Sequence, residues 1–172
     1  ETQLRQQSAT EFGVVPSVLA AFSATQHVPW HLRNILPCGE ALLPETCERT
    51  FVVAEGSTRI WNMYGPTESA VYSHFKQVNR SDTRLTTIPI GRPFRGRSSY
   101  VLDKSNDIVP VGVAGELYIG GAGLAVGYAG QRQLTNAAFT TVPTLTTEKL
   151  YKTGDIVRLH ADGSLRFLGR SD

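Results

Sequence analysis

The hydrophobic and polar positions of the first part of the chain repeat with the periods of helices and strands in turn. Pro16 begins the apolar segment 16–22, and Pro44 begins a second segment that extends to about residue 54. Because a proline favours the first helical turn, both segments are predicted to be helices. Leu32, Ile35 and Leu36 make 32–36 a short, largely apolar segment, and residues 58–63 are rich in β-branched and aromatic side chains, which is typical of strands. Strands and helices that alternate with short links predict a parallel sheet covered by helices.

Beyond about residue 80 the pattern changes to short alternating segments separated by turn residues. The four segments predicted as strands are residues 98–103, 115–119, 154–159 and 164–168. Lys-Ser-Asn-Asp at 104–107 and Ala-Asp-Gly at 161–163 are turn sequences, and one helix is expected at 134–139. Such strands favour a small antiparallel sheet or barrel. The expected fold is therefore α/β followed by mainly β, with one part at residues 1–81 and the other at 82–172.

Composition narrows the classes of function. Of the 172 residues, 41% are hydrophobic and 19% are charged, which excludes a disordered chain. Seventeen Lys and Arg face fifteen Asp and Glu without a basic run, so we expect no nucleic-acid partner. The apolar stretches are far shorter than the ~20 residues of a membrane-spanning helix, so we expect no membrane partner. Because the chain starts at Glu1 and ends without a closing helix, we expect it to be an excerpt of a longer polypeptide.

Cysteine and histidine are sparse. Cys38 and Cys47 are the only cysteines, and no Cys or His spacing around them matches a structural zinc site. Two reduced cysteines suit a cytoplasmic protein, and a disulfide between them is the less favoured alternative.

The first motif with chemical content follows a predicted strand. Residues 62–68 read Asn-Met-Tyr-Gly-Pro-Thr-Glu. The carboxyl edge of an α/β sheet is where ligands bind, and a turn there can surround a phosphate. Glu68 could supply a hard oxygen ligand to Mg²⁺, and Tyr64 a flat face for a nucleobase. The same residues also fit an ordinary strand-to-helix turn with a capping acid.

Two further motifs lie in the β-rich part. Residues 115–128 form a strand followed by closely spaced glycines, without the Gly-Lys-Ser or Gly-Lys-Thr of a Walker loop, which favours a structural role for the glycines. Residues 151–155 read Tyr-Lys-Thr-Gly-Asp, and residues 169–172 read Gly-Arg-Ser-Asp. Asp155, expected at the start of a strand, could accept hydrogen bonds from both ribose hydroxyls, and Arg170 could hold a phosphate or the ribose edge. Each motif alone also fits turn and surface residues.

Taken in this order, the motifs resemble the adenylation domain of nonribosomal peptide synthetases, a member of the adenylate-forming superfamily. Ile-Gly-Arg-Pro at 90–93 and Tyr-Val-Leu-Asp at 100–103 also resemble its connecting segments, and the resemblance extends over residues 32–172. It implies part of the family's large domain, a layered α/β subdomain followed by a small distorted β-barrel. It also implies that an amino-acid carboxylate attacks the α-phosphorus of ATP, that pyrophosphate leaves, and that the acyl group passes to a phosphopantetheine thiol, in secondary-metabolite biosynthesis.

The resemblance implies a role for individual residues at the nucleotide. Tyr64 would stack on adenine, Asn62 would bond its amino edge, Thr67 would meet the α-phosphate, Glu68 would hold Mg²⁺ and Asp155 would bind the ribose hydroxyls. The remaining residues implied to lie beside the nucleotide are Gly39, Glu40, Ala41, Gly65, Phe167 and Arg170. The implied partners are the amino acid, the peptidyl carrier and condensation domains of the same synthetase, and the N-terminal and C-terminal parts of the adenylation domain that this chain lacks.

The resemblance also implies an amino-acid pocket, placed by motif offset. Its residues would be Leu36, Cys38, Met63, Val71 and Tyr72. These side chains are apolar except for one thiol and one phenol, so a buried charged substrate would lack a partner at a cost of roughly several kcal/mol. We therefore expect a neutral, medium-sized amino acid, while plain core packing of Leu36 and Val71 stays open. Asp172 matches the hinge of the family's small C-terminal domain.

The chain also departs from the family. Val126 stands where the family usually has Arg or Lys, and the phosphate loop, the amine-binding aspartate and the C-terminal lysine are absent from these residues. We therefore expect the excerpt to be inactive by itself. Two alternatives stay open: an acyl- or aryl-coenzyme A ligase of the same superfamily, and a catalytically silent binding module.

Overall fold

The computed structural model describes residues 6–24, 31–54 and 58–171. The chain forms two compact units, each made of two stretches of sequence. The first unit contains residues 1–63 and 75–90, and the second contains residues 64–74 and 91–172. The motif at 62–68 is therefore divided, because its first two residues belong to the first unit and the rest to the second.

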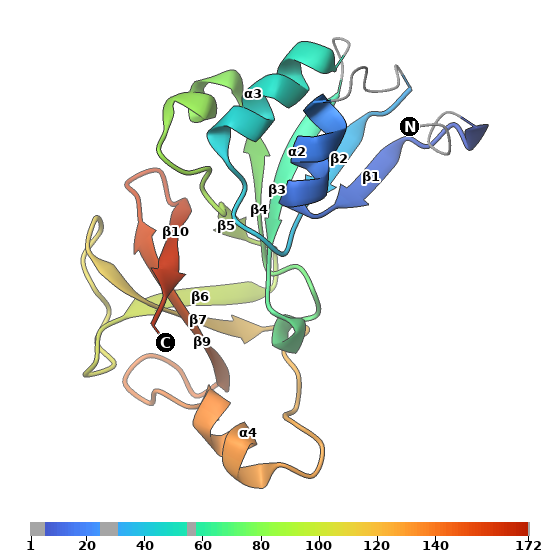
Figure 1. Cartoon of the computed structure of the whole chain (residues 1–172). Helices are drawn as coiled ribbons and strands as arrows, with labels where there is room; N and C mark the ends of the chain where they lie inside the picture. The colour runs from blue at the N-terminus through green and yellow to red at the C-terminus, as the bar shows by residue number, and fades with distance from the viewer. Residues whose placement is uncertain (1–5, 25–30, 55–57, 172) are drawn as a thin grey trace. The chain divides into compact units, whose positions relative to one another are not determined.

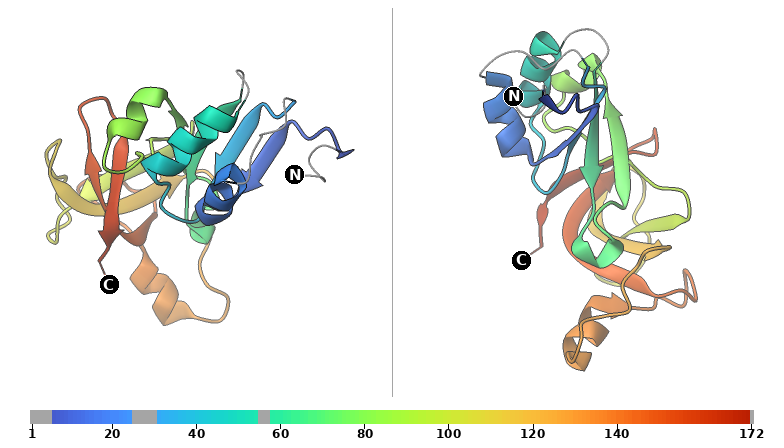
Figure 2. Two further views of the ribbon diagram at one scale, coloured as in Figure 1. Left: turned by 45° about the horizontal axis from the view of Figure 1, so that its top comes forward. Right: turned by 90° about the vertical axis from the view of Figure 1, so that its right-hand side faces the viewer.

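The first unit is a sheet covered by helices. Its strands are β1 (Glu11–Val14), β2 (Asn34–Pro37), β3 (Arg59–Tyr64) and β4 (His74–Val78), which lie in that order. β1 pairs with β2 and β2 with β3, both in parallel, as expected. Helices α2 (Pro16–Ala24) and α3 (Pro44–Val53) cover one face of this sheet (Figures 1 and 2).

Both helices begin at the proline that predicted them. The core between helices and sheet consists of the buried side chains Leu19, Leu32, Ile35, Leu42, Cys47, Ile60, Val78 and Ile88. Thr50, wholly buried on α3, donates its hydroxyl hydrogen bond to the Thr46 carbonyl at 2.7 Å, so its polar group is satisfied within the helix. Cys38 and Cys47 are both free thiols, and burial raises the pKa of Cys47 to about 12.

The short 3₁₀ helix η2 (Arg80–Arg84) lies against α3 in the first unit. It begins with a capping box, in which the Asn79 side chain accepts from the N3 backbone and the Asp82 carboxylate accepts from the Asn79 N–H at 2.7 Å. Asp82 also pairs with Lys76 Nζ at 2.9 Å. The polar residues that follow β4 are thus used locally to begin a helix.

The second unit is built on an antiparallel sheet. Strands β6 (Arg97–Leu102), β7 (Ala114–Gly121), β9 (Leu150–Leu159) and β10 (Leu165–Arg170) pair in the order β10-β9-β7-β6. The pairings are antiparallel, which confirms the expected architecture. β5 (Arg92–Pro93) precedes the sheet, and α4 (Arg132–Ala138) leads into β8 (Phe139–Thr140), which pairs with β9 (Figure 1).

Turn and glycine chemistry in this unit follows the sequence. Between β9 and β10, the Asp162 carboxylate accepts from the Ser164 N–H and hydroxyl at 3.0 and 2.6 Å, and Gly163 has a φ of +78°. In the glycine-rich segment, a Cβ on Gly121 would lie 2.4 Å from the Gly96 carbonyl oxygen. This glycine therefore allows close backbone approach between the ends of β7 and β6, which supports the structural role.

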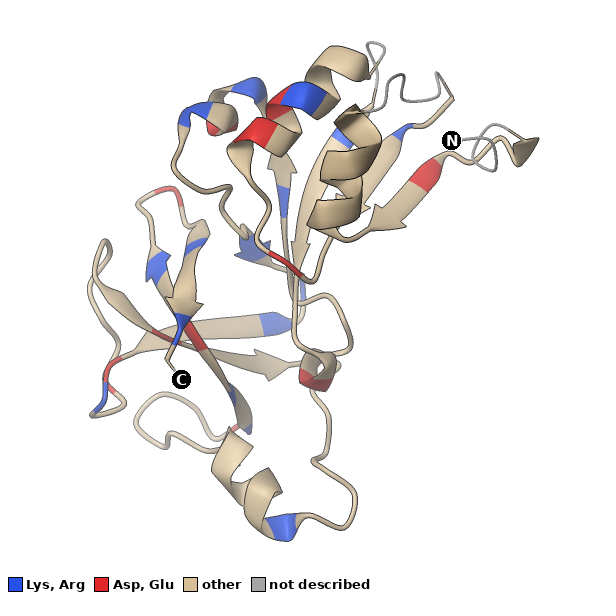
Figure 3. Ribbon diagram, viewed as in Figure 1, with Lys and Arg blue, Asp and Glu red and all other residues tan. Residues whose placement is uncertain are grey.

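Charged residues of both signs occur in both units (Figure 3). Figure 3 shows Lys and Arg interspersed with Asp and Glu along the elements of each unit. No helix in the described part of the chain has both the length and the apolar character needed to cross a membrane.

Candidate functional site

The segment 64–74 folds back on itself at the end of β3. The Ser73 N–H donates to the Tyr64 carbonyl at 2.8 Å, and a Cβ on Gly65 would lie 2.5 Å from the Val71 carbonyl oxygen, so only glycine fits there. The 3₁₀ helix η1 (Thr67–Ser69) is followed by Ala70 and Val71 at φ of +53° and +68°. A β-branched residue in the left-handed region is strained, and such strain clusters at binding sites.

Asp155 lies in a bulge inside a strand. Glu116 pairs with Ile156 while Tyr118 pairs with Lys152, so β9 carries two extra residues opposite this part of β7. Gly154 takes a φ of +74° in the bulge. The prediction that Asp155 stands at a strand start is therefore wrong: β9 begins at Leu150. A bulge uses the same residue types as a turn, which explains the misplacement.

Three of the expected site residues meet at this bulge. The Tyr64 hydroxyl donates to Asp155 Oδ2. Arg170, opposite Asp155 in the β10–β9 register, places Nη1 3.3 Å from Asp155 Oδ1 and 3.1 Å from the Thr153 carbonyl. Burial, with a further contribution from the Asp155 carboxylate, raises the pKa of Tyr64 above its ordinary value. The phenol therefore stays neutral and donates.

The Glu68 carboxylate bonds to a tyrosine to which the sequence motifs gave no role. The Tyr128 hydroxyl donates to Glu68 Oε1 at 2.5 Å. Burial raises the pKa of Tyr151, and the Tyr128 phenol and the Glu68 carboxylate add to this increase.

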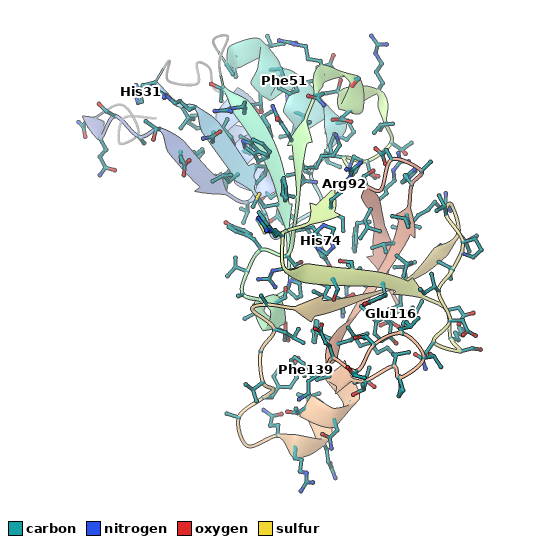
Figure 4. The ribbon with its side chains drawn as sticks, turned by 180° about the vertical axis from the view of Figure 1, so that it is seen from behind. His31, Phe51, His74, Arg92, Glu116 and Phe139 are labelled. Carbon is teal, nitrogen blue, oxygen red and sulfur yellow. The ribbon has the colours of Figure 1, made fainter. Side chains whose placement is uncertain are left out.

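A histidine supports Tyr64 from its buried side. His74, labelled in Figure 4, is wholly buried, with Nδ1 2.8 Å from Ser73 Oγ and Nε2 2.6 Å from Ser99 Oγ. Its ring meets the Tyr64 ring edge-on at 5.5 Å between centroids. Burial, with a smaller contribution from Arg97, lowers the pKa of His74 to about 4, so the imidazole is neutral at pH 7. No spacing in the sequence indicated this role.

The expected site residues of the first unit make local contacts. Glu40 accepts from the Ser17 N–H and hydroxyl at 2.9 and 3.0 Å, at the start of α2. Asn62 is buried and donates from Nδ2 to the Pro89 carbonyl at 2.8 Å. The other expected residues of this unit are Leu36 and Cys38, which are half-buried, Gly39 and Ala41, which are exposed, and Met63, which is buried.

The remaining expected residues belong to the second unit or lie beyond the described residues. Val71 is 56% exposed in this chain, so it is not part of the core of either unit. Thr67 is exposed, and Tyr72 and Phe167 are half-buried. Asp172, expected as the hinge, lies outside the described residues.

Comparison with known proteins identifies the family to which the chain belongs. Residues 2–129 match the model of the family described as AMP-binding enzyme. The chain belongs to the AMP-binding enzyme family. Together with the synthetases that the chain resembles, this membership confirms the resemblance to the adenylation domains of nonribosomal peptide synthetases and the α/β-then-β fold class that the motifs implied.

Individual relatives agree with this family. Bacitracin synthase 1 of Bacillus licheniformis is 41% identical over 143 residues, which are 83% of this chain and 3% of that protein. The structure of AB3403, a four-domain nonribosomal peptide synthetase bound to AMP and glycine, superposes with a TM-score of 0.88 at 36% identity, over 98% of this chain and 12% of that one. The AMPPNP-bound synthetase FmoA3 superposes with a TM-score of 0.90 at 29% identity, over 98% and 18%.

The matches also show how small a part of these relatives the chain represents. It spans 2 to 7% of the length of the first curated relatives that it matches.

Proposed function

We propose that this chain is part of an adenylation domain that activates an amino acid with ATP to an aminoacyl-adenylate and passes the acyl group to a carrier-bound phosphopantetheine. The observation that carries the proposal is the cluster in the second unit, where Tyr64, Asp155 and Arg170 meet. Membership of the AMP-binding family and the AMP, glycine and AMPPNP bound to similar synthetases support it. The similar proteins described above are peptide synthetases, so we do not propose a coenzyme A ligase.

The cluster at the β9 bulge would hold the nucleoside. The Asp155 carboxylate accepts one bond from Tyr64 and faces Arg170, and a carboxylate has about four lone-pair sites, so two remain for the ribose hydroxyls. Arg170 is about half exposed and could reach a phosphate or the ribose edge. The Tyr64 ring, held by His74, would stack on adenine, with Gly65 allowing the close turn.

Residues outside the bulge complete the proposed nucleotide site. In the second unit Phe167 lies on β10, and its aromatic ring is proposed to stand beside the nucleotide. From the first unit we assign Asn62 to the amino edge of adenine and the segment 39–41 to the surface beneath it. The amide nitrogen of Asn62 donates to the Pro89 carbonyl, so its amide oxygen is the atom that suits an acceptor role toward the adenine amino group.

The donor set fits a magnesium ion that arrives with the nucleotide. Among the described residues, no group of three His, Cys, Asp or Glu side chains could hold a metal by itself. Mg²⁺ in ATP sites uses one or two carboxylates, phosphate oxygens and waters, so Glu68 alone is a sufficient protein ligand. When bound, the ion would neutralise phosphate charge. Thr67, exposed on η1 beside Glu68, is proposed to donate its hydroxyl hydrogen bond to the α-phosphate.

The reaction proceeds in two displacements. The amino-acid carboxylate attacks the α-phosphorus, the bond to the β-phosphate oxygen breaks, and pyrophosphate leaves with its electron pair. The phosphopantetheine thiolate then attacks the acyl carbon and AMP leaves. This chain's contribution is to position the nucleotide for in-line attack.

The same proposal assigns an amino-acid pocket and protein partners. Leu36, Cys38, Met63, Val71 and Tyr72 are proposed to line the amino-acid pocket, which favours a neutral side chain. Peptidyl carrier and condensation domains of the same synthetase are the proposed protein partners, with Asp172 as the hinge. Two free thiols suit a cytoplasmic location.

The test is ATP–pyrophosphate exchange by the full-length protein that contains this chain, assayed across neutral and charged amino acids. Asp155→Ala is expected to raise the KM for ATP at least about tenfold, because it removes a charge-assisted ribose contact of roughly 1.5–3 kcal/mol. Asp107→Ala, at an exposed turn, is the matched control and should leave the KM unchanged. An unchanged KM in Asp155→Ala, or exchange that no amino acid stimulates, contradicts the proposal.

A further inference from the structure

The Glu68 carboxylate stands on a segment that cannot orient it alone. η1 contains only three residues, and the two residues after it have positive φ. A half-buried glutamate has three side-chain torsions, whose freedom must be lost before the carboxylate has a fixed position. The fixed position of this carboxylate must therefore come from contacts made by other elements.

A tyrosine from a distant part of the second unit makes such a contact. Tyr128 precedes α4 and donates to Glu68 Oε1 at 2.5 Å. A second tyrosine, Tyr151 on β9, packs against the same phenylalanine as Tyr128, and the Glu68 carboxylate contributes to the raised pKa of its phenol. The Ala125 N–H donates to the Glu68 carbonyl at 2.8 Å, so the backbone of η1 is also tied to the segment that carries Tyr128.

Both tyrosine rings are held by one aromatic side chain. Phe139, labelled in Figure 4, is buried on β8. Its ring centroid lies 5.7 Å from that of Tyr128 and 5.1 Å from that of Tyr151. Edge-to-face and tilted rings at such distances attract each other, by about 0.5–1.5 kcal/mol a pair. The three rings therefore form one unit, the aromatic triad Tyr128, Phe139 and Tyr151.

The backbone of Tyr128 is fixed as well. Its N–H donates to Thr135 Oγ1 of α4 at 2.9 Å. A Cβ on Gly127 would lie 2.3 Å from Thr135 Cγ2, so the glycine before Tyr128 is needed for this approach. Gly127 and Thr135 thus help to fix the position of Tyr128.

The choice of phenols has an electrostatic consequence. In the described part of the chain, Asp155 pairs with Arg170 and Glu116 with Lys152, whereas no Lys or Arg pairs with Glu68. Neutral donors fix the carboxylate without cancelling its charge. A cation in their place would repel a divalent metal ion and occupy the oxygens that it needs.

We propose that Tyr128 and Tyr151 are positioning residues that aim the Glu68 carboxylate at a nucleotide-bound divalent cation, with Phe139 holding both rings. This inference rests on the proposed function, since it assumes that Glu68 is the metal ligand. Neither tyrosine touches the reacting atoms. Their removal should weaken the metal–nucleotide complex and leave the affinity for the metal-free nucleoside monophosphate unchanged.

The experiment uses the full-length protein and Mn²⁺, whose paramagnetic resonance reports binding without turnover. The Kd of Mn²⁺–ATP is measured without amino acid, and the Kd of AMP is measured by calorimetry without metal. Tyr128→Phe is expected to raise the Kd of Mn²⁺–ATP about tenfold, the usual loss when a ligand loses its orienting hydrogen bond. Tyr151→Phe removes the second phenol and is expected to raise this Kd by a smaller factor. The Kd of AMP should stay the same.

Matched variants separate orientation from general destabilisation. Tyr118→Phe removes a hydroxyl from a similarly buried tyrosine of the same sheet, whose bond to Asn106 lies away from Glu68, and should change neither Kd. In a Glu68→Gln background, Tyr128→Phe should have no further effect, because the carboxylate that it orients is gone.

The outcomes distinguish this inference from the proposed function. If Glu68→Gln weakens Mn²⁺–ATP binding but neither tyrosine variant does, the positioning role is overturned and the proposed function stands. If the tyrosine variants weaken AMP binding equally, their role is structural and the inference is again overturned. If the wild-type protein binds no Mn²⁺–ATP, both are overturned.

Discussion

The longest side-chain hydrogen bonds of the two units join residues at different distances along the chain. Among the described residues of the first unit, side-chain hydrogen bonds join positions at most 29 apart, as from Arg80 to the Phe51 carbonyl. In the second unit, Tyr128 reaches Glu68 across 60 residues, and Tyr64 reaches Asp155 across 91. The site of the second unit therefore depends on side-chain contacts between residues much farther apart in the sequence than those of the first unit.

The largest expected effect on the free energy of unfolding comes from truncating a buried core side chain, because both units have a packed core. Ile35→Ala in the first unit and Leu117→Ala in the second each remove a wholly buried side chain. Each should lower the free energy of unfolding by about 2–5 kcal/mol, because both leave a cavity in a packed core. Urea unfolding of the full-length variants measures the loss. A loss below about 1 kcal/mol in either variant would show that the position is not part of a closely packed core.

A pH titration tests the second unit at His74, the buried residue that packs against Tyr64. Its pKa is lowered to about 4, so protons bind the unfolded state more readily and stability falls as the pH drops below about 6.5. Between pH 7 and pH 5 this one group should cost about 2 kcal/mol of unfolding free energy. Urea unfolding at both pH values measures the loss.

The control for this titration is His74→Gln, which keeps hydrogen-bonding capacity to Ser73 and Ser99 without a titrating ring. The variant should lose stability less than the wild type between the two pH values. Equal losses in both proteins would mean that His74 titrates normally.

The smallest expected effect tests the local side of the comparison. Asp82→Ala removes the capping box of η2 and the pair with Lys76 and should cost about 1 kcal/mol of unfolding free energy. Because these contacts are confined to the first unit, the Kd of AMP should not change. Thr83→Ala, whose hydroxyl bonds only the exposed Arg80 carbonyl, is the neighbouring control. A weakened affinity for AMP in Asp82→Ala would refute this separation of local stability from binding.

Local sequence was sufficient for most of the secondary structure. Pro16 and Pro44 predicted the starts of both helices, and the Ala-Asp-Gly turn predicted the hairpin between β9 and β10. Prediction from the local sequence failed where the same residue types fit two different structures. The Thr-Gly-Asp sequence was interpreted as a turn before a strand, but it forms a bulge within β9. β4 was missed because its polar side chains do not alternate clearly with apolar ones.

The sequence by itself determined the family, the order of the elements and the identity of most candidate ligand-binding residues, because these depend on short motifs whose residues are neighbours in the chain. Only the tertiary structure decided that Tyr64 donates to Asp155, that His74 supports Tyr64 and that Tyr128 donates to Glu68. The physical reason is that a hydrogen bond needs its atoms within about 3 Å, and for residues 60 or more positions apart only the packing of strands provides that proximity.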